Sequence, residues 1–354
     1  MTKNKFKYLV ILILIILAVY SCSEKFDLSV FNTDSSGNIA GDTLYVKLNP
    51  DWTGFNKPQD ILVGREPLIY VADTENDMVV MMNIDGKRLG SISVKHPVAI
   101  AQDYKLNLIV CAEFDTLGHT FSAVYKINLV AVDHQIGIAP VTRILPKLSD
   151  LNKPDRIFTG VSVFYDNSYL VARQGPNNSN LIDPDNSLLK FVAGKNGKSD
   201  SLIGRVPSLA PSSTGILSVN KVSRLKSFNK NNYDILLSLT GNNSFKVQWL
   251  HFVTSQEFTG YQNNLDPAAS DLMEPNFFIQ PHGICLDPSG NIYVVDTEKD
   301  SVYKYNSFGY ELIGFGGTEI FNQPYAVDYF NKILYVADTG NNRILRFQLS
   351  TDIR

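Results

Sequence analysis

The stretch from Gln280 to Phe347 contains one sequence pattern written twice. Each copy begins with Gln-Pro, continues into an apolar run that ends in Asp, and closes with another apolar run after a polar turn. Asp296 and Asp338 occupy the same place in the two copies and are 42 residues apart. A self-similar period of this size is typical of proteins built from repeated structural units.

Each copy contains three short runs rich in Val, Ile, Leu and Tyr, and Gly, Pro, Asn, Asp and Ser separate these runs. Such runs indicate strands joined by turns. A fourth run, Tyr310–Phe315, follows the first copy. Parallel strands would need crossover helices, and no sustained 3.6-residue apolar periodicity is present. The repeat therefore predicts a four-stranded antiparallel blade of a β-propeller.

Two motifs carry a resemblance to a known family. They are Pro-x-Gly-Ile-x-Leu-Asp at 281–287 and Ile-Leu-Tyr-Val-Ala-Asp-Thr-Gly-Asn-Asn-Arg-Ile at 333–344. They resemble the NHL repeat of six-bladed β-propellers, and residues 57–86 resemble it as well. The resemblance implies an all-β, six-bladed β-propeller of four-stranded antiparallel blades, and the whole chain looks like a Bacteroidota-type envelope lipoprotein of this kind.

The rest of the chain supplies the other blades. The predicted second strands of blades one to six end at Asp73, Glu113, Arg173, Leu239, Asp296 and Asp338. The last copy has only three strands, so we expect residues 43–48 to close the ring beside 343–349. Three polar stretches, 174–187, 194–213 and 254–275, are interpreted as loops inserted on the rim or on one face.

The N-terminus has the features of a bacterial lipoprotein signal. Lys3, Lys5 and Lys7 precede the apolar run Leu9–Val19, whose 11 residues are too short to span a bilayer. Ser21-Cys22 follows and resembles a lipobox, although Tyr20 departs from the usual residue there. We expect cleavage of residues 1–21 and acylation of Cys22, with palmitate among the acyl chains.

The predicted organisation is a signal peptide at 1–21, a flexible polar tether at 22–42 and a propeller at 43–354. The lipid would hold a monomeric propeller at the cell envelope, at the outer membrane, with the periplasmic and surface sides both open. Removing the three leader lysines takes the formal charge from −3 to −6. A mildly acidic surface argues against a nucleic-acid partner.

The aspartates that recur at the ends of second strands, Asp73, Asp296 and Asp338, are interpreted as structural turn residues. A carboxylate in such a place can accept backbone N–H groups and fix the turn. A residue that is repeated in several blades usually serves the blade, so we do not treat these aspartates as a catalytic or metal site.

The residue after the blade-opening proline does vary, and it is Gln59, Val98, His282 or Tyr325. First strands line the central channel and begin at the end where the Asp turns lie. We therefore expect Gln59, His282 and Tyr325 to lie at one mouth of the channel, and we treat them as candidate ligand-binding residues.

Metal sites are not expected. Zinc needs three or four ligands, and of the five histidines (His96, His119, His134, His251 and His282) only His282 occupies a channel position. Asp60 and Asp328 lie near inner strands, but Asp287 and Asp328 are interpreted as turn residues at strand ends. Asp183–Ser187 resembles a calcium loop without the Gly and distal Glu of an EF-hand. Cys111 and Cys285 belong to opposite blades and are expected to be free and buried.

These observations favour a binding module for a protein, peptide or glycan at the channel-mouth face, without a cofactor and without assigned catalytic residues. Two alternatives stay open. One is a lyase or hydrolase at the channel mouth, similar to the peptidyl-hydroxyglycine amidating lyases or to the gluconolactonase-like calcium propellers. The other is an envelope assembly scaffold without a small ligand.

Overall fold

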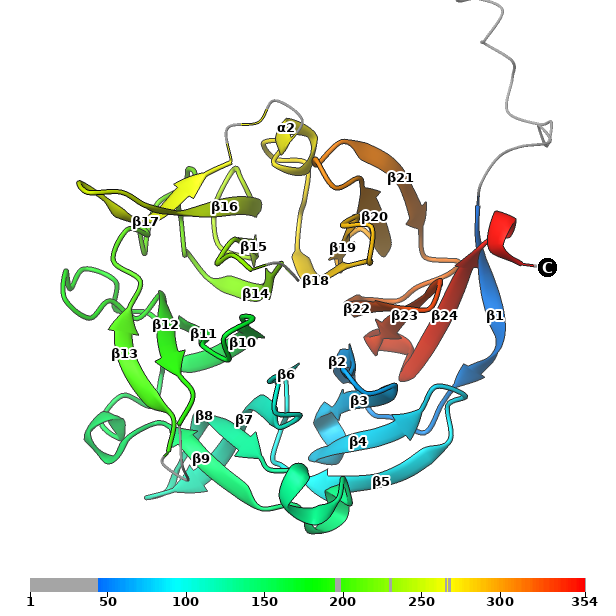
Figure 1. Ribbon diagram of the computed structural model, residues 1–354, viewed down its shortest axis with the longest axis horizontal. Helices are drawn as coiled ribbons and strands as arrows, with labels where there is room; N and C mark the ends of the chain where they lie inside the picture. Colours follow the sequence, from blue (N-terminus) through cyan, green and yellow to red (C-terminus); the bar gives the residue numbers. More distant parts are fainter. Residues whose placement is uncertain (1–43, 195–198, 229–230, 265, 267–268, 354) are drawn as a thin grey trace, which may run out of the picture. The chain divides into compact units, whose positions relative to one another are not determined.

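The computed structural model describes residues 44–194, 199–228, 231–264, 266 and 269–353. Within this part of the chain six four-stranded antiparallel sheets are arranged around a central axis (Figure 1). The predicted six-bladed β-propeller is confirmed. The predicted signal peptide, Cys22 and the tether lie outside the described residues. Among the residues that are described, no helix is long and apolar enough to cross a membrane.

Blades one to three use twelve consecutive strands, and the first strand of each blade lies innermost. Their bounds are β2 (Pro58–Val63), β3 (Leu68–Asp73), β4 (Met78–Asn83) and β5 (Arg88–Ser93); β6 (Ala99–Gln102), β7 (Leu108–Thr116), β8 (His119–Ile127) and β9 (Val141–Leu145); β10 (Ile157–Val163), β11 (Tyr169–Gln174), β12 (Ser187–Val192) and β13 (Ser201–Arg205).

Blades four to six complete the ring. Their strands are β14 (Val222–Ser227), β15 (Ile235–Leu239), β16 (Val247–Thr254) and β17 (Thr259–Asn263); β18 (Pro281–Leu286), β19 (Ile292–Asp296), β20 (Ser301–Tyr305) and β21 (Glu311–Gly316); β22 (Pro324–Phe330), β23 (Ile333–Asp338), β24 (Arg343–Leu349) and β1 (Tyr45–Trp52). A one-turn helix, α2 (Ala269–Leu272), precedes blade five.

The ring is closed by a strand from the other end of the chain, as predicted. β1 pairs antiparallel with β24, and Tyr45 lies opposite Leu349. Trp52, at the end of β1, is buried against Tyr335, with ring centroids 5.7 Å apart. Gly86 lies beneath the indole, because a Cβ added there would be 2.3 Å from the Trp52 ring. Closure pairs sheet edges that would otherwise be exposed.

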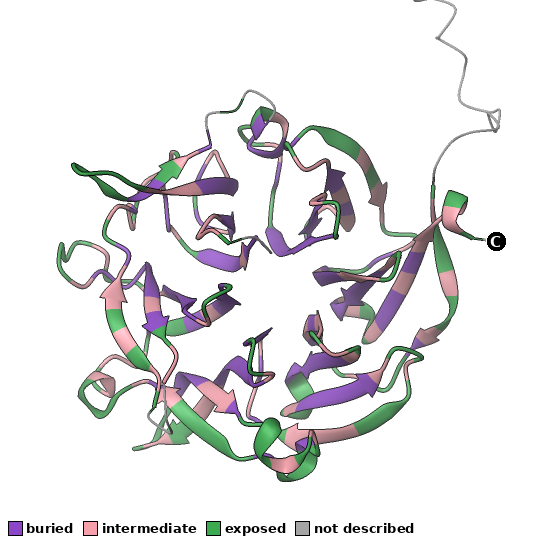
Figure 2. Ribbon diagram, in the orientation of Figure 1, coloured by how far each residue is buried: buried purple, intermediate pink, exposed green. Residues whose placement is uncertain are grey.

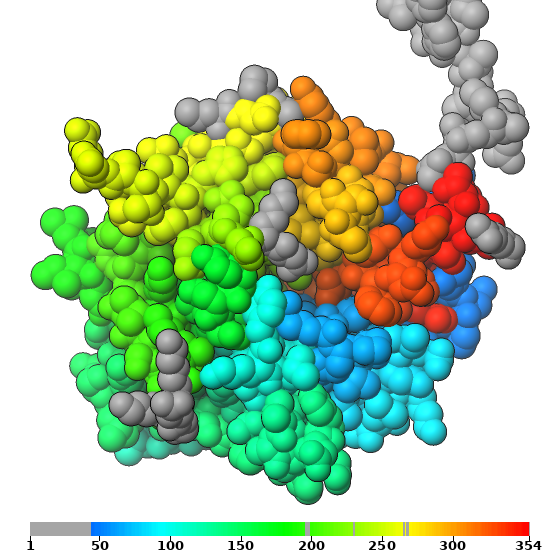
Figure 3. Space-filling model, viewed as in Figure 1, coloured from blue at the N-terminus to red at the C-terminus, as the bar shows by residue number. Residues whose placement is uncertain are grey.

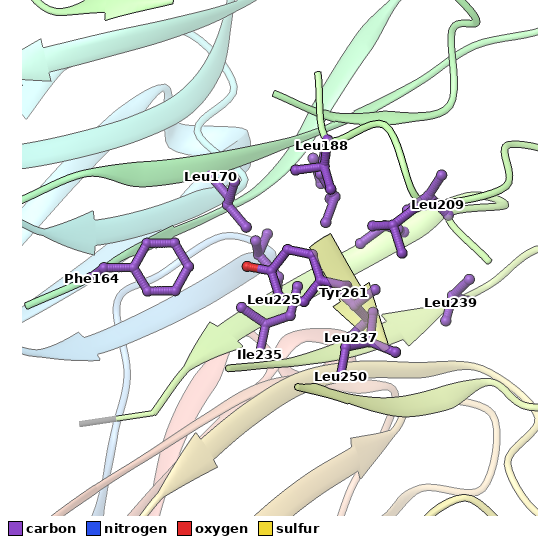
Figure 4. Packing of buried hydrophobic residues seen from close by; sticks show 14 residues of the cluster. Phe164, Leu170, Leu188, Leu209, Leu225, Ile235, Leu237, Leu239, Leu250 and Tyr261 are labelled. Atoms are coloured by element: carbon purple, nitrogen blue, oxygen red, sulfur yellow. The ribbon is translucent and has the colours of Figure 1, made fainter. Parts of the chain in front are cut away.

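The core lies between neighbouring blades, and the outer strands carry most of the exposed positions (Figure 2). One cluster packs Phe164 and Leu170 of blade three against Leu225, Leu237 and Tyr261 of blade four (Figure 4). Each blade thus buries both faces of its sheet, which explains the nearly continuous apolar runs in the second strands.

Two of the three predicted loops were assigned wrongly in part. Residues 194–213 contain β13, and residues 254–275 contain β17 and α2. β13 and β17 are the outermost strands of their blades, and each pairs with a single neighbouring strand. They therefore contain Ser, Gly, Thr and Asn at positions where inner strands have apolar residues. Residues 175–186 form an irregular insertion, as expected for the first of the three stretches.

Candidate functional site in the central channel

The inner strands of the six blades surround the channel axis. Comparing them places Gln59, Val98, Thr159, Ser223, His282 and Tyr325 at one equivalent position, directly after the residue that opens each blade. The pairing to the second strand shifts next to this position in blades one, three, four, five and six. Such a bulge re-aims the backbone locally, and in blades one to four the carbonyls at this position meet a single side chain.

That side chain is Arg224 of β14. Its Nη1 donates to the carbonyls of Thr159 at 2.6 Å and Ser223 at 2.9 Å. Its Nη2 donates to the carbonyls of Gln59 at 3.1 Å and Val98 at 2.5 Å. One guanidinium therefore joins the inner strands of blades one to four, and Arg224 is 8% exposed. The planar fork of five N–H donors suits Arg for this role, which Lys could not fill.

The position after the carbonyls is small in four blades, where it is Ala99, Gly160, Gly283 or Ala326. It is charged in the other two, as Asp60 in blade one and Arg224 in blade four. A Cβ on Gly283 would lie 2.6 Å from the Ala326 Cα, so the inner strands of blades five and six approach too closely for a larger residue. The small residues leave the channel free for the Arg224 side chain.

The predicted residues His282 and Tyr325 lie together in this layer. Their rings stack with centroids 3.8 Å apart at 27°. The Tyr325 ring centroid is 5.7 Å from the Arg224 Cζ, and Gln59 contributes its carbonyl to the same guanidinium. His282 is buried, and its Nδ1 contacts the Ser223 hydroxyl. Burial, assisted by Arg224, lowers the pKa of His282 well below its usual value, so the imidazole is neutral at physiological pH.

A cavity of about 90 Å³ lies next to Arg224, and residues of all six inner strands line it. Its charged residues are Asp60, Arg65, Arg224, Lys226 and Asp328. A second hollow of about 220 Å³ shares Leu62, Arg65, Gln102, Lys226 and Asp328 with it. Both lie toward the carboxyl ends of the inner strands, whereas Gln59, His282 and Tyr325 lie near their amino ends. In the space-filling view coloured atoms occupy the ring's centre where the ribbons leave a gap, so that gap is not an open pore (Figure 3).

Asp60 and Asp328 serve the inner strands that they border. The Asp60 carboxylate accepts N–H groups from Ile100 at 2.7 Å and Ile61 at 3.0 Å. The Asp328 carboxylate accepts the N–H of Val63 at 2.7 Å. Each carboxylate thus pairs an N–H on the free edge of the next blade's inner strand, a group that would otherwise be left unsatisfied.

The interpretation of Asp328 as a turn residue was wrong. It lies within β22, and the strand runs two residues further. Asp287, by contrast, follows β18, and its carboxylate accepts N–H groups of Ser289 and Asn291 at 2.9 Å each, as a turn residue does. Both Asp residues follow apolar runs, so the sequence pattern alone does not separate them.

Burial affects the acid of Asp60 strongly. It raises the pKa of this carboxyl from 3.8 to about 6, because desolvation outweighs the favourable field of Arg224 and Asp328 adds further negative charge. Lys226 lies 3.9 Å from an Asp328 oxygen, a loose ion pair. Perturbed acids in a cavity are typical of functional sites, although structural networks also produce them.

The recurring aspartates Asp73, Asp296 and Asp338 are fully buried at the other end of the blades. In each case the carboxylate accepts N–H groups of the segment that enters the same blade's inner strand: Asn56 for Asp73, Ile279 and Gln280 for Asp296, and Asn322 for Asp338.

The threonine after each of these aspartates reaches the next blade. Hydroxyls of Thr74, Thr297 and Thr339 donate to the carbonyls of the blade-opening prolines Pro97, Pro324 and Pro58, at 2.8, 2.7 and 2.5 Å. The Asp-Thr pair therefore ties a blade to its own entry segment and to its neighbour.

Blade three has Arg173 where blades one, five and six have Asp, and the insertion 175–186 compensates for this reversal of charge. The Asp183 carboxylate pairs with Arg173 at 2.6 Å, Arg156 at 2.7 Å and Lys153 at 2.9 Å. Asp185 pairs with Arg156 at 2.6 Å. The cations hold the pKa of Asp183 well below its usual value. The segment that resembles a calcium loop is thus occupied by arginine and lysine side chains.

Two cysteines lie in the described part of the chain. Cys111 and Cys285 are free and buried, as predicted. No group of three or more His, Cys, Asp and Glu side chains there is placed to hold a metal ion.

The residues that sequence reasoning missed are Arg65, Arg224 and Lys226. Arg224 and Lys226 lie in the inner strand of blade four, which lacks the opening Pro of the repeat. A comparison of the six inner strands position by position gives the signal, since Arg224 stands where four blades have Ala or Gly.

Comparison with known proteins agrees with this architecture. The family model described as NHL repeat matches residues 278–302. No curated protein sequence matches the chain significantly.

Solved structures resemble the chain in fold. An auxiliary nutrient binding protein from Bacteroides thetaiotaomicron has a TM-score of 0.57 at 8% identity and covers 84% of this chain and 70% of its own. A structural genomics protein from the same organism has 0.54 at 16%, with 85% and 72% covered. A Xanthomonas campestris gluconolactonase has 0.52 at 12%, with 87% and 90% covered. Identities this low establish the fold alone, and the folds matched include a binding protein and an enzyme: the chain is a six-bladed β-propeller in which residues 278–302 match the NHL repeat.

Proposed function

We propose that this chain is a ligand-binding propeller of the cell envelope, with its ligand site in the charged channel cavity. The observation that carries the proposal is the convergence of Asp60, Arg65, Lys226 and Asp328 from three inner-strand segments on one hollow. Arg224 closes the hollow toward the opposite end of the channel, so a ligand enters from the carboxyl ends of the inner strands. A protein, peptide or glycan would place one polar end in the cavity and rest its remainder on the surrounding face.

A cavity-filling variant tests the site. Ala101 lines the cavity and is 8% exposed, and Ala101→Met would add three heavy atoms to a volume of about 90 Å³. The full chain and this variant are screened by thermal shift against a defined set of oligosaccharides and peptides. We expect ligands that raise the melting temperature of the wild type to lose at least half of that shift in the variant. The same ligands with undiminished shifts in a folded Ala101→Met variant would place the site elsewhere.

The anchoring part of the proposal has its own test. In cells that express the full chain, Cys22→Ser should move the protein from the membrane fraction to the soluble fraction, because the acyl chains supply the attachment. Mass spectrometry of the wild-type N-terminal peptide should show diacylglyceryl and acyl groups on Cys22. Membrane retention of the Cys22→Ser variant contradicts lipid anchoring and leaves the channel site unaffected.

A hydrolase or lyase is the second candidate, and one contact favours it. The Ser223 hydroxyl meets a neutral His282 imidazole, the arrangement that activates a serine nucleophile. Both side chains are buried and Tyr325 stacks on the imidazole, so a substrate would have to displace that ring. Hydrolysis of p-nitrophenyl acetate or of D-glucono-1,5-lactone by the wild type, lost in His282→Gln, would favour this candidate over binding alone.

A further inference from the structure

The charges around the cavity are graded with depth. Arg224, at the floor, is buried; Lys226, at mid-depth, is half-buried; Arg65, at the rim, is exposed. The Arg65 guanidinium stacks on Tyr104, 3.3 Å from the ring centroid, and forms no ion pair with another described residue. A row of cations from rim to floor raises the local concentration of anions and guides them inward.

The acids of the cavity do not balance these cations. One Asp328 oxygen accepts the Val63 N–H and the other accepts the Tyr329 N–H, so both are used by the backbone. Lys226 lies 3.9 Å from the nearer of them, beyond hydrogen-bond distance. Asp60 is partly protonated near neutral pH. Three cations therefore face at most two negative charges, and fewer once Asp60 is protonated.

A polar group of the floor also lacks a partner. Arg224 is 8% exposed, and its Nε has no hydrogen-bond acceptor in the described part of the chain, although its Nη atoms are satisfied by four carbonyls. A buried donor without an acceptor is unfavourable for the folded state. The partners of the Nη atoms are neutral carbonyls, so no hydrogen-bonded carboxylate cancels the positive charge of Arg224, and its field acts on an anion held in the cavity.

We propose that the cavity binds a carboxylate group of the ligand, received by Lys226 and Arg65 and oriented by the field of Arg224. This inference rests on the proposed function and names the chemistry of its ligand. The carboxylate could belong to a peptide C-terminus or to a uronic acid. A protonated Asp60 would donate a hydrogen bond to it, whereas an ionised Asp60 would repel it.

The pH dependence of binding follows from the groups that face Asp60. These are Arg65 on the segment after β2, Arg224 and Lys226 on β14, and Asp328 on β22; the parts of β6, β10 and β18 that line the cavity contribute no charged side chain. Near Arg224, His282 stays neutral because its pKa is lowered. Asp60, whose pKa is raised to about 6, titrates between pH 5.5 and 7.5, and lowering the pH over this range should strengthen binding of a carboxylate that stays ionised.

The experiment is a ligand-observed NMR titration of the full chain with four probes: acetate, acetamide, D-glucuronate and D-glucose. N-acetylglycine and its amide form a third pair that represents a peptide end. We expect the carboxylates to bind and their neutral counterparts to bind at least about tenfold more weakly, since a charge-assisted hydrogen bond contributes ~1.5–3 kcal/mol. Whether glucuronate or N-acetylglycine binds more tightly distinguishes the two sources of the carboxylate.

Variants of the cavity complete the test. Lys226→Met should weaken acetate binding about tenfold, and Arg65→Gln, at the exposed rim, gives a second variant that does not disturb the interior. Lys87→Met, at an exposed turn between β4 and β5, is the matched control and should bind like the wild type. Asp60→Asn should abolish the strengthening of acetate binding between pH 7.5 and 5.5.

Equal binding of acetate and acetamide, or unchanged acetate binding in both Lys226→Met and Arg65→Gln, would overturn the carboxylate assignment. A neutral ligand whose binding is lost in Ala101→Met would still support the proposed channel site in that case. Failure of the proposed function has a different signature, namely ligands that bind the wild type and the Ala101→Met variant equally.

Discussion

At the scale of single residues, Asp60 and Arg224 give the channel its character. They occupy the same position in opposite blades of a six-membered ring, where the other four blades have Ala or Gly. Arg224 contributes to the fold by joining four inner strands. Asp60 accepts two backbone N–H groups, but its ionised form is unfavourable because the carboxylate loses hydration in the folded protein. A residue that weakens the fold at neutral pH is more easily explained by a site than by packing.

This difference leads to a prediction for Asp60→Asn. The carboxyl has a pKa of about 6 in the folded protein and 3.8 as the reference value. The folded state therefore binds the proton more tightly, so the contribution of Asp60 to stability is present below pH 4 and is lost as the pH rises through 6. We therefore compare the free energy of unfolding of Asp60→Asn with that of the wild type at each pH. The difference, variant minus wild type, should be larger at pH 7.5 than at pH 4 by up to about 3 kcal/mol.

Urea denaturation at the two pH values measures this change. Asp85→Asn, at an exposed turn, is the control and should show no such pH-dependent difference. Because Asn can replace only one of the two acceptor oxygens of Asp60, a constant loss of about 1 kcal/mol at both pH values is expected in addition. A stability difference that does not change with pH would show that Asp60 titrates normally.

At the scale of elements, the Asp-Thr pair after each well-formed second strand explains why the repeat has this sequence. In blade six, Asp338 holds the entry segment at Asn322, and Thr339 donates to Pro58 of blade one. The link joins blades that are far apart in sequence. Blade three replaces the pair by Arg173-Gln174; there Asp183 of the following insertion pairs with Arg173, and the Gln174 amide donates to the Val222 carbonyl of blade four at 2.8 Å.

Thr339→Val should therefore destabilise the protein by about 1–2 kcal/mol, since it leaves the buried Pro58 carbonyl without this donor while it preserves the shape of the side chain. Thermal or urea unfolding of the full chain measures the loss. Thr53→Val, at an exposed position after β1, should change the stability by less than about 0.5 kcal/mol. Equal stability of Thr339→Val and the wild type would mean that water replaces the hydroxyl.

The insertion of blade three gives a prediction about metal ions. The carboxylates of Asp183 and Asp185 are already paired with Arg156, Arg173 and Lys153. Calcium would have to displace three cationic side chains that hold these oxygens. Millimolar calcium and EDTA should leave the melting temperature of the full chain unchanged within about 1 °C. A rise of several degrees with calcium would instead identify a binding site.

At the scale of the whole molecule, the architecture was predictable because several independent features of the sequence indicate the same fold. The Asp-to-Asp period, the strand punctuation and the missing fourth strand of the last blade together predicted six blades and a closing strand from the N-terminal side. The outer strands β13 and β17 were missed. Each is an edge strand with one neighbour, and each contains a glycine, Gly204 or Gly260, so neither has the apolar run that identifies inner strands.

The channel was less predictable, because its chemistry depends on residues that break the repeat. Gln59, His282 and Tyr325 were placed at the channel by their position in the pattern. The position of the cavity depends on the sizes of the side chains at several successive positions of all six inner strands. The cavity lies at the other end of the channel from these three residues. Arg224 determines this position, and no local motif marks it.

The pairing of β1 with β24 has a consequence for how the chain can be cut and rejoined. The Ser350 N–H donates to the Leu44 carbonyl at 2.8 Å, so the first and last segments of the folded ring are direct neighbours. A short linker between them, with new termini opened in another inter-blade connection such as the turn at Gly317, should give a circular permutant with the same six sheets. We therefore expect that the propeller does not depend on the order in which its blades occur along the chain.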